Sequence, residues 1–292
     1  MHQKEKNMTY EEFKSTITKK LANYLPEEYK EITVQFSQTQ KVNETYESAI
    51  FSVPGHRCSP TINIEERYNA GCTSMQELAD LLVQSFANAP TLDLSKGNIL
   101  DNLFFEVINT DMNADLIKKI PHIDVCGDLV GIYRMKVGEN LNEMESLIVT
   151  NQLLKQADIS EEELLRATTK STDIILPPVS KSLSDMIYEI TGVREPEQNM
   201  MYVMTNELKM FGANVLVNDT RLQEMADTLC GNFYIIPSSI HEVLAVPDNK
   251  PAEMLQNIVK DVNNTQLREN EILSYKVFHY CAKTHCLSVA AE

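Results

Sequence analysis

Glycine and proline are scarce in this chain, and basic residues are fewer than acidic ones. The 9 glycines and 11 prolines among 292 residues argue against a disordered or low-complexity chain. With 43% hydrophobic residues, the chain can bury a substantial core without disulfides or metals. The 26 Lys and Arg against 42 Asp and Glu give a net charge of −16, which repels nucleic-acid phosphates and anionic membranes. We therefore expect no direct nucleic-acid binding and no membrane docking.

Long apolar runs, a secretory signal and C-x-x-C pairs are also missing. No apolar run approaches the roughly 20 residues that a spanning helix needs. Residues 1–7 lack the apolar core of a signal peptide, and Met8 is the more natural first residue of the fold, whether or not residues 1–7 are native. This context predicts a cytoplasmic protein with reduced, mostly buried thiols. The cysteines are Cys58, Cys72, Cys126, Cys230, Cys281 and Cys286.

Familiar catalytic motifs are absent as well. The sequence has no Walker loop, no dinucleotide-binding glycine pattern, no H-E-x-x-H and no paired-carboxylate motif. These absences count against common NTPase, dehydrogenase and zincin activities. They do not exclude an enzyme of a less familiar kind, so whether the chain is an enzyme stays open. We expect no cofactor.

The patterns present predict an α+β protein, beginning with an α-β-β-β-α unit over residues 8–92. Thr9 and Glu12 form a capping box, and Pro26 ends the helix that follows. Strands are expected at 32–36, 49–53 and 61–64, with a turn at 40–44. Ser74 then begins a second helix, and residues 90–93 are a candidate boundary.

A larger α+β region is expected over residues 98–292. It opens with a strand at 103–108 and a short helix between 111 and 121. Strands at 129–137 and 146–150, joined by an acidic turn, form a predicted hairpin. Near the end, the helix after Pro251 should bury one apolar face, and strands at 275–280 and 286–289 should form a second hairpin. The residues expected on that helix face are Met254, Leu255, Ile258, Val259 and Val262.

The spacing of this region predicts a diverged strand-helix-strand repeat, with copies near 146–190 and 201–246. Ser160-x-x-Glu163 and Thr220-x-x-Gln223 read as helix caps, and each lies 17 residues before a proline that ends an apolar run. The alternative is two ordinary strand-helix-strand passages that coincide in spacing. If the duplication is real, residues 146–177 and 201–237 should superpose as strand, helix and strand with the same handedness. Opposite handedness, or strands in different sheets, would contradict it.

Several segments resemble a known family. They are Met8-Thr9-Tyr10-Glu11-Glu12-Phe13, Tyr24-Leu25-Pro26, Pro121-His122, Asp128-Leu129-Val130, Tyr133-Arg134, Thr150-Asn151, Ile159-Ser160-Glu161-Glu162-Glu163-Leu164, Tyr202-Val203-Met204-Thr205-Asn206, Phe211-Gly212-Ala213, and Tyr234 through Val243. In this order they resemble the bacterial (Firmicutes) domain of unknown function 5688. The resemblance implies a bacterial cytoplasm or a mobile element as the setting, and it implies no activity, because the family is uncharacterised.

The best candidate site is the connection between two apolar strands after Pro237. It holds Ser238, Ser239, His241 and Glu242. In an extended segment Ser239 and His241 share a face, so they could be a nucleophile and its base, with Glu242 orienting the ring. The alternative is a turn in which a serine caps the backbone and His241 hydrogen-bonds to the main chain. No G-x-S-x-G elbow and no nearby glycine supports the catalytic interpretation.

Three other groups have simpler interpretations. The C-terminal His279, Cys281, His285 and Cys286 resemble zinc ligands, but adjacent residues of a strand point to opposite faces, so we expect no metal. Asp128 and Arg134 are expected to pair as a structural clamp. Paired glutamates fall mostly in first helical turns, where the helix dipole favours them.

The function itself is not determined by these patterns. Our hypothesis is an accessory protein that acts through protein contacts. The alternatives are a hydrolase or transferase built around Ser239, His241 and Glu242, and an acidic inhibitor that imitates DNA.

Overall fold

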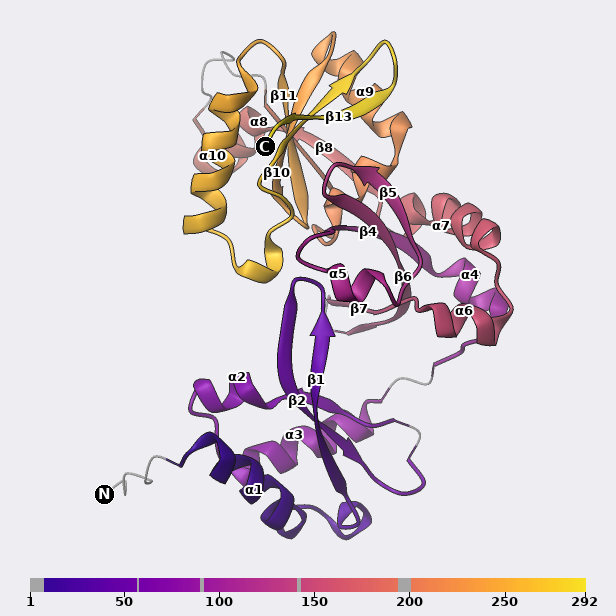
Figure 1. Cartoon of the computed structure of the whole chain (residues 1–292), viewed down its shortest axis with the longest axis vertical. Coiled ribbons are helices and arrows are strands. Elements are labelled where there is room, and N and C mark those ends of the chain that lie inside the picture. Colours follow the sequence, from indigo (N-terminus) through magenta and orange to yellow (C-terminus); the bar gives the residue numbers. More distant parts are fainter. Residues whose placement is uncertain (1–7, 57, 90–91, 141–142, 194–200) are drawn as a thin grey trace. The chain divides into compact units, whose positions relative to one another are not determined.

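The computed structural model describes residues 8–56, 58–89, 92–140, 143–193 and 201–292. Helices and antiparallel sheets together confirm the α+β class (Figure 1). The chain divides into two compact units, Met1–Thr91 and Leu92–Glu292. In the described residues, no helix has the length and apolar character needed to cross a membrane.

The first unit opens with the expected helix. α1 (Tyr10–Lys20) begins at a complete capping box, in which the Glu12 carboxylate accepts the Thr9 N–H at 2.8 Å. Two short 3₁₀ segments, η1 (Leu21–Tyr24) and η2 (Glu27–Tyr29), follow around Pro26. Phe13 and Ile17, one helical turn apart, are fully buried in this unit's core.

A three-stranded antiparallel sheet packs on the helices of this unit. β1 (Thr33–Lys41) pairs with β2 (Glu44–Ser52), and β2 pairs with β3 (Thr61–Asn63). The β1–β2 turn is tighter than predicted because Asn43 adopts a left-handed φ of 57°, which lets both strands run on to the turn. α2 (Ile64–Asn69) was not predicted; α3 (Met75–Ala87) begins at Ser74 as expected.

The second unit begins with a four-stranded sheet. α4 (Lys96–Asp101) leads into β4 (Leu103–Asn109), and α5 (Ala114–Ile117) leads into β5 (His122–Cys126). β6 (Leu129–Asn140) pairs with β4, β5 and β7 (Glu143–Ile148), which confirms the β6–β7 hairpin. His122 and Asp124, for which no strand was predicted, lie on β5, which pairs with β6 across a tight turn at Gly127.

A six-stranded antiparallel sheet completes the unit, in the order β13-β12-β10-β11-β9-β8. Its strands are β8 (Pro178–Ser182), β9 (Tyr202–Asn206), β10 (Phe233–Ser239), β11 (Glu242–Pro247), β12 (Val277–Cys281) and β13 (Cys286–Ala291). β12 and β13 confirm the predicted C-terminal hairpin. The remaining elements are α8 (Leu183–Thr191), η3 (Gly212–Val217), α9 (Asp219–Leu229), α10 (Ala252–Thr265) and η4 (Glu269–Glu271).

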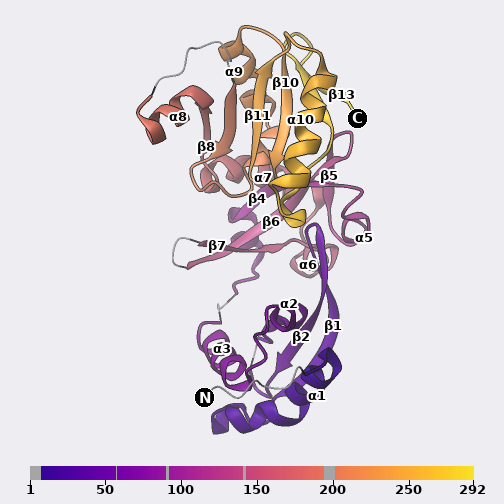
Figure 2. The same ribbon diagram turned by 90° about the vertical axis from the view of Figure 1, so that its left-hand side faces the viewer.

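Helices cover both faces of this sheet. Ile235 of β10 packs with α9, whereas its neighbour Ile236 packs with α10, as alternation along a strand requires. Figure 2 shows α10 in front of these strands. The α9 side also contains Val107 and Leu129 of the four-stranded sheet. The two sheets of the second unit therefore share one hydrophobic core.

The repeat is not present as a strand-helix-strand duplication. β7 belongs to the four-stranded sheet, whereas β8 belongs to the six-stranded one. Between them, α6 (Asn151–Ala157) precedes α7 (Glu161–Ile175), so the apolar run 174–176 ends a helix and is not a strand. The Ser160–Glu163 box starts a 15-residue helix whose buried residues run from Leu164 to Thr172. A short apolar run does not by itself distinguish helix from strand. In the second passage α9 is capped by Asn218, not Thr220.

Two predictions of burial were also wrong. Met254 and Ile258 of α10 are 58% and 54% exposed, because the face packed on the sheet is centred on Leu255 and Val259. The five predicted positions span a wider arc of the helix than one sheet can cover. All six cysteines are free, and each is half-buried or exposed. The reason is their position at the ends of strands (Cys126, Cys281 and Cys286), at the end of a helix (Cys230) or outside helices and strands (Cys58 and Cys72).

Candidate functional site

The predicted site residues lie where β10 turns into β11. The pairing of these strands shifts register between Pro237 and Ser239, so the chain makes a bulge before Glu242. The buried Ser239 Oγ accepts the backbone N–H of His241 at 3.0 Å. Ser238 Oγ donates to Glu242 Oε1 at 3.4 Å. Both hydroxyls therefore engage the turn itself, the geometry in which a serine satisfies the local backbone.

The His241 imidazole faces a different segment. Its Nδ1 accepts the backbone N–H of Phe211 at 3.2 Å. An accepting Nδ1 places the proton of the neutral ring on Nε2. The Ser239 hydroxyl thus contacts His241 through its main chain, whereas the imidazole ring is oriented by Phe211. The hydroxyl and the imidazole are therefore not bonded to each other.

The loop that meets His241 is organised by a buried side chain, Asn206. Its Oδ1 accepts the N–H groups of Leu208 and Met210 at 3.0 and 3.4 Å, and its Nδ2 donates to the Met210 carbonyl at 2.7 Å. Asn206 is 1% exposed. These three bonds satisfy a buried amide and turn the chain so that Phe211 enters the core with a left-handed φ of 56°. Left-handed backbone in a bulky residue is uncommon, and such strain concentrates at functional sites.

Gly212 allows this loop to touch the bulge. A Cβ at Gly212 would lie 2.2 Å from the His241 carbonyl oxygen and 2.3 Å from Thr205 Oγ1. The Thr205 hydroxyl donates to the same carbonyl at 2.8 Å. Only glycine permits so close an approach of two backbones.

A buried ion pair lies on the other side of Phe211. Arg134 Nη1 is 2.7 Å from Glu106 Oε2, and Arg134 Nε donates to Ser146 Oγ at 3.0 Å. The Arg134 guanidinium lies 4.9 Å from the centre of the Phe211 ring, within cation–π range. We call Glu106, Arg134, Phe211 and His241 the Arg134 cluster. It joins β4 and β6 to the β9–η3 loop and to the β10–β11 bulge.

Burial raises the pKa of Glu106, and the Arg134 charge opposes that rise. The carboxylate is 1% exposed, so without Arg134 it would be an uncompensated charge in the core. Glu106 was not predicted as a functional residue. A glutamate in the otherwise apolar segment LFFEVIN is the signal that could have found it.

The prediction that Asp128 pairs with Arg134 was wrong. Asp128 instead accepts hydrogen bonds from the Ser274 hydroxyl at 2.9 and 3.0 Å and from Asn109 Nδ2 at 2.8 Å. Asn109 also donates to the carbonyl of Leu273 at 3.1 Å. Asp128 follows the tight turn between β5 and β6. Arg134 lies six residues further along the chain, within β6. The clamp that exists ties the four-stranded sheet to the segment before β12.

The C-terminal histidines bind separate carboxylates. His279 Nε2 lies 3.2 Å from Asp248 Oδ2, and His285 Nδ1 lies 2.9 Å from Asp219 Oδ2. Across the described residues, no group of three or more potential ligands could hold a metal ion.

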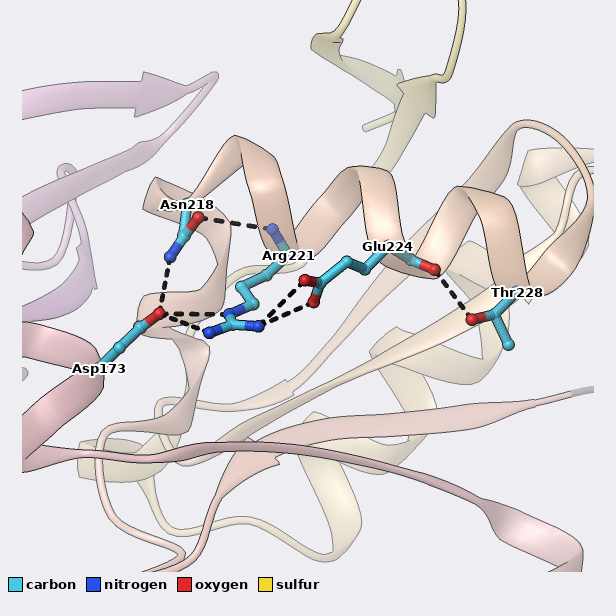
Figure 3. A network of polar contacts seen from close by, with 5 residues as sticks. All are labelled: Asp173, Asn218, Arg221, Glu224 and Thr228. Atoms are coloured by element: carbon cyan, nitrogen blue, oxygen red, sulfur yellow. Dashed lines mark hydrogen bonds and ion pairs between the residues drawn. The ribbon is translucent and has the colours of Figure 1, made fainter.

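A partly exposed network joins α7 to α9 (Figure 3). Arg221 lies between Asp173 and Glu224, at 2.9 Å from a carboxylate oxygen of each, and Asn218 also donates to Asp173. Glu224 in turn accepts, through its carbonyl, the Thr228 hydroxyl. Because every member pairs within the network, it fastens two helices and leaves no group aimed at a ligand.

An exposed apolar stripe lies on the outer face of α10. Met254 and Ile258, four residues apart, lie on one side of the helix, and Val262 continues the line half-buried. The opposite side of α10 packs on the sheet. A binding face requires an apolar surface on an element that is held rigidly from behind. The stripe on α10 meets both requirements.

The fold and these sites define an α+β protein with two compact units, whose larger unit joins two antiparallel sheets around a buried Glu–Arg pair. The chain belongs to the family of unknown function DUF5688, whose model matches residues 10–282. No curated protein and no solved structure matches it. The family match agrees with the sequence resemblance.

Proposed function

We propose that this protein is a cytoplasmic accessory protein of a bacterium or mobile element that acts through protein–protein contacts. The observation that carries the proposal is the exposure of Met254 and Ile258 on α10. Free, accessible cysteines fit a reducing compartment. The partner face we infer is an apolar groove that accepts one side of a helix.

The negative charge of the larger unit indicates which residues would surround that groove on the partner. Residues 92–292 hold 30 of the 42 acidic residues but only 17 of the 26 basic ones. Glu253 and Asp261, on α10 itself, are exposed beside the stripe. A partner with basic residues around an apolar groove would complement this surface, and the attraction of its rim would weaken with salt.

The test is capture of partners from native host cells with the stripe intact and with it charged. Met254→Glu with Ile258→Glu should abolish capture, because a charge cannot enter an apolar groove. Leu165→Glu with Ile174→Glu is the matched control, since these α7 side chains are 41% and 71% exposed and the charge change is equal. Loss of the same partner in both variants, or retention in both, would contradict the proposal. Self-association through the stripe, seen by light scattering, would also contradict it.

The alternative, a hydrolase or transferase around Ser239, His241 and Glu242, needs a rearrangement. Ser239 Oγ would have to release the His241 N–H and reach the imidazole, whose Nδ1 is already engaged by Phe211. Nucleophilic catalysis requires hydroxyl and base within hydrogen-bond reach. The alternative of an acidic DNA mimic would need carboxylates spaced along one face, whereas the described glutamate pairs lie mainly in first helical turns.

A further inference from the structure

Two cysteines face each other across the C-terminal hairpin. Cys281 ends β12, Cys286 begins β13, and the register pairs them directly. Directly opposed residues of an antiparallel pair have Cα atoms about 4.5 or 5.5 Å apart, depending on the hydrogen-bonding position. Disulfides span Cα separations of about 4.4–6.8 Å. Either position therefore allows a bond without separating the strands.

Both sulfur atoms converge on one residue of the turn, Thr284. Cys286 Sγ lies 3.3 Å from the Thr284 carbonyl oxygen, where the thiol donates. The Thr284 hydroxyl and N–H, together with the Lys283 N–H, hydrogen-bond to the sulfur of Cys281. The Cys286 thiol, which donates a hydrogen bond, and the Cys281 sulfur, which accepts several, thus lie beside the same residue, Thr284.

We propose that Cys281 and Cys286 form a reversible redox site that closes into an intramolecular disulfide when it meets a small-molecule disulfide such as oxidised glutathione. Cys281 is the attacking sulfur because its bonds from Thr284 and Lys283 stabilise the thiolate. These bonds, and the Lys283 charge, lower the pKa of Cys281 from its ordinary value. Cys281 is half-buried and Cys286 exposed, so a small oxidant can reach the pair.

The chemistry is two successive thiol–disulfide exchanges. The Cys281 thiolate attacks one sulfur of the oxidised glutathione, forming a mixed disulfide and releasing one glutathione thiolate. Cys286 then loses its proton and attacks the Cys281 sulfur, which forms the Cys281–Cys286 bond and releases the second glutathione thiolate. The two cysteines are oxidised by two electrons, and one oxidised glutathione becomes two reduced molecules.

The test uses the full chain, incubated with excess oxidised glutathione, alkylated and digested for mass spectrometry. We expect a peptide linking Cys281 to Cys286, loss of two of the six free thiols, and full recovery with dithiothreitol. Cys286→Ser should stop at a stable glutathione adduct on Cys281, because no second thiol is present. Cys72→Ser, which removes an exposed cysteine of the first unit, should leave the link intact. Glutathione adducts on both cysteines of the unaltered chain, with no linked peptide, would overturn the proposal.

A second measurement isolates the role of Thr284. Thr284→Val keeps the size of the side chain and removes the hydroxyl donor. At neutral pH, Cys281 in this variant should react with iodoacetamide several-fold more slowly, and the pH at which its rate rises should move upward. Alkylation of the exposed Cys230 in the same sample should be unchanged. An unaltered Cys281 rate would show that the thiolate is not stabilised there and would overturn its assignment as the attacking sulfur.

Discussion

Arg134 Nη1 lies 2.7 Å from Glu106 Oε2 in the core of the larger unit, and the same guanidinium stacks over Phe211. Glu106 is on β4, Arg134 on β6, and Phe211 follows β9. The ion pair thus belongs to the four-stranded sheet, while the ring it faces belongs to a loop of the six-stranded one. Through Phe211 it reaches His241, the residue that the sequence singled out for other reasons.

Removing Arg134 should destabilise the protein strongly. Arg134→Met leaves the buried Glu106 carboxylate without its counter-charge, and breaking such a pair typically costs about 3–5 kcal/mol in the free energy of unfolding. Urea denaturation followed by circular dichroism measures this. The double variant Glu106→Gln with Arg134→Met removes both charges and should recover part of the loss. A single variant with unaltered stability would show that the pair is not buried in solution.

The pH dependence of the stability of Arg134→Met follows from the direction in which the pKa of Glu106 is shifted. Because burial raises the pKa of Glu106 above its usual value near 4.5, the folded state binds a proton at this carboxyl more tightly than the unfolded state does. Stability from this group is therefore present at low pH and declines as pH rises through the folded pKa. Without Arg134 the rise is larger. The deficit of Arg134→Met relative to the parent chain should consequently be smaller at pH 5 than at pH 8.

Gly212→Ala should be markedly destabilising. Its Cβ would meet the His241 carbonyl at 2.2 Å, and the contact is with backbone, which yields only by moving the β10–β11 bulge. Overpacking of this kind costs about 1–3 kcal/mol. Gly97→Ala in α4 is the control, because nothing lies within 4 Å of its Cβ and alanine favours a helix, adding about 0.5–1 kcal/mol. Equal midpoints for the two variants in thermal unfolding would refute the close approach.

His241→Ala distinguishes a structural imidazole from a functional one. Loss of the ring leaves the Phe211 N–H without its acceptor, and an unsatisfied buried donor costs about 1–3 kcal/mol. We expect this loss in chemical denaturation, with partner capture retained. His279→Ala, whose ring pairs with Asp248 at the surface, should change stability by less than about 0.5 kcal/mol. Normal stability of His241→Ala combined with loss of partners would assign the ring to the binding function.

Glu163 should make stability sensitive to acid. Hydrogen bonds from the Ser160 backbone, and then from Lys96, lower its pKa to about 2. A carboxyl with a lowered folded pKa adds stability above its unfolded value near 4.5 and loses it as pH falls toward 2. Glu163→Gln should flatten the acid limb of a stability–pH curve. Glu162→Gln removes the same charge from the same helical turn without the cap, so an equal flattening there would contradict this assignment.

Much of the local structure was predictable from the sequence. The Thr9–Glu12 capping box, the β6–β7 hairpin and the C-terminal hairpin appear where their patterns placed them. Each depends on residues close in sequence, whose hydrogen bonds form whenever that segment folds. The 237–243 segment was likewise found from its chemistry, and the structure shows its residues closing a turn.

The partners of charged and apolar residues were not predictable in the same way. Asp128 and Arg134 are near each other in sequence and opposite in charge, yet Asp128 binds Ser274, 146 residues away, and Arg134 binds Glu106. Sheet register and burial select these pairs. Likewise, matching intervals suggested a repeat, but β7 and β8 pair in different sheets.

The sequence by itself determined the α+β class, the family and the segments where the chain caps, turns and pairs with its neighbours, because these depend on short-range hydrogen bonds and side-chain periodicity. Only the tertiary structure decided that Glu106 and Arg134 share the core, that Gly212 must lack a side chain, and that Met254 and Ile258 face outward. Those outcomes depend on which surfaces exclude water once distant strands have met, and no local pattern contains that information.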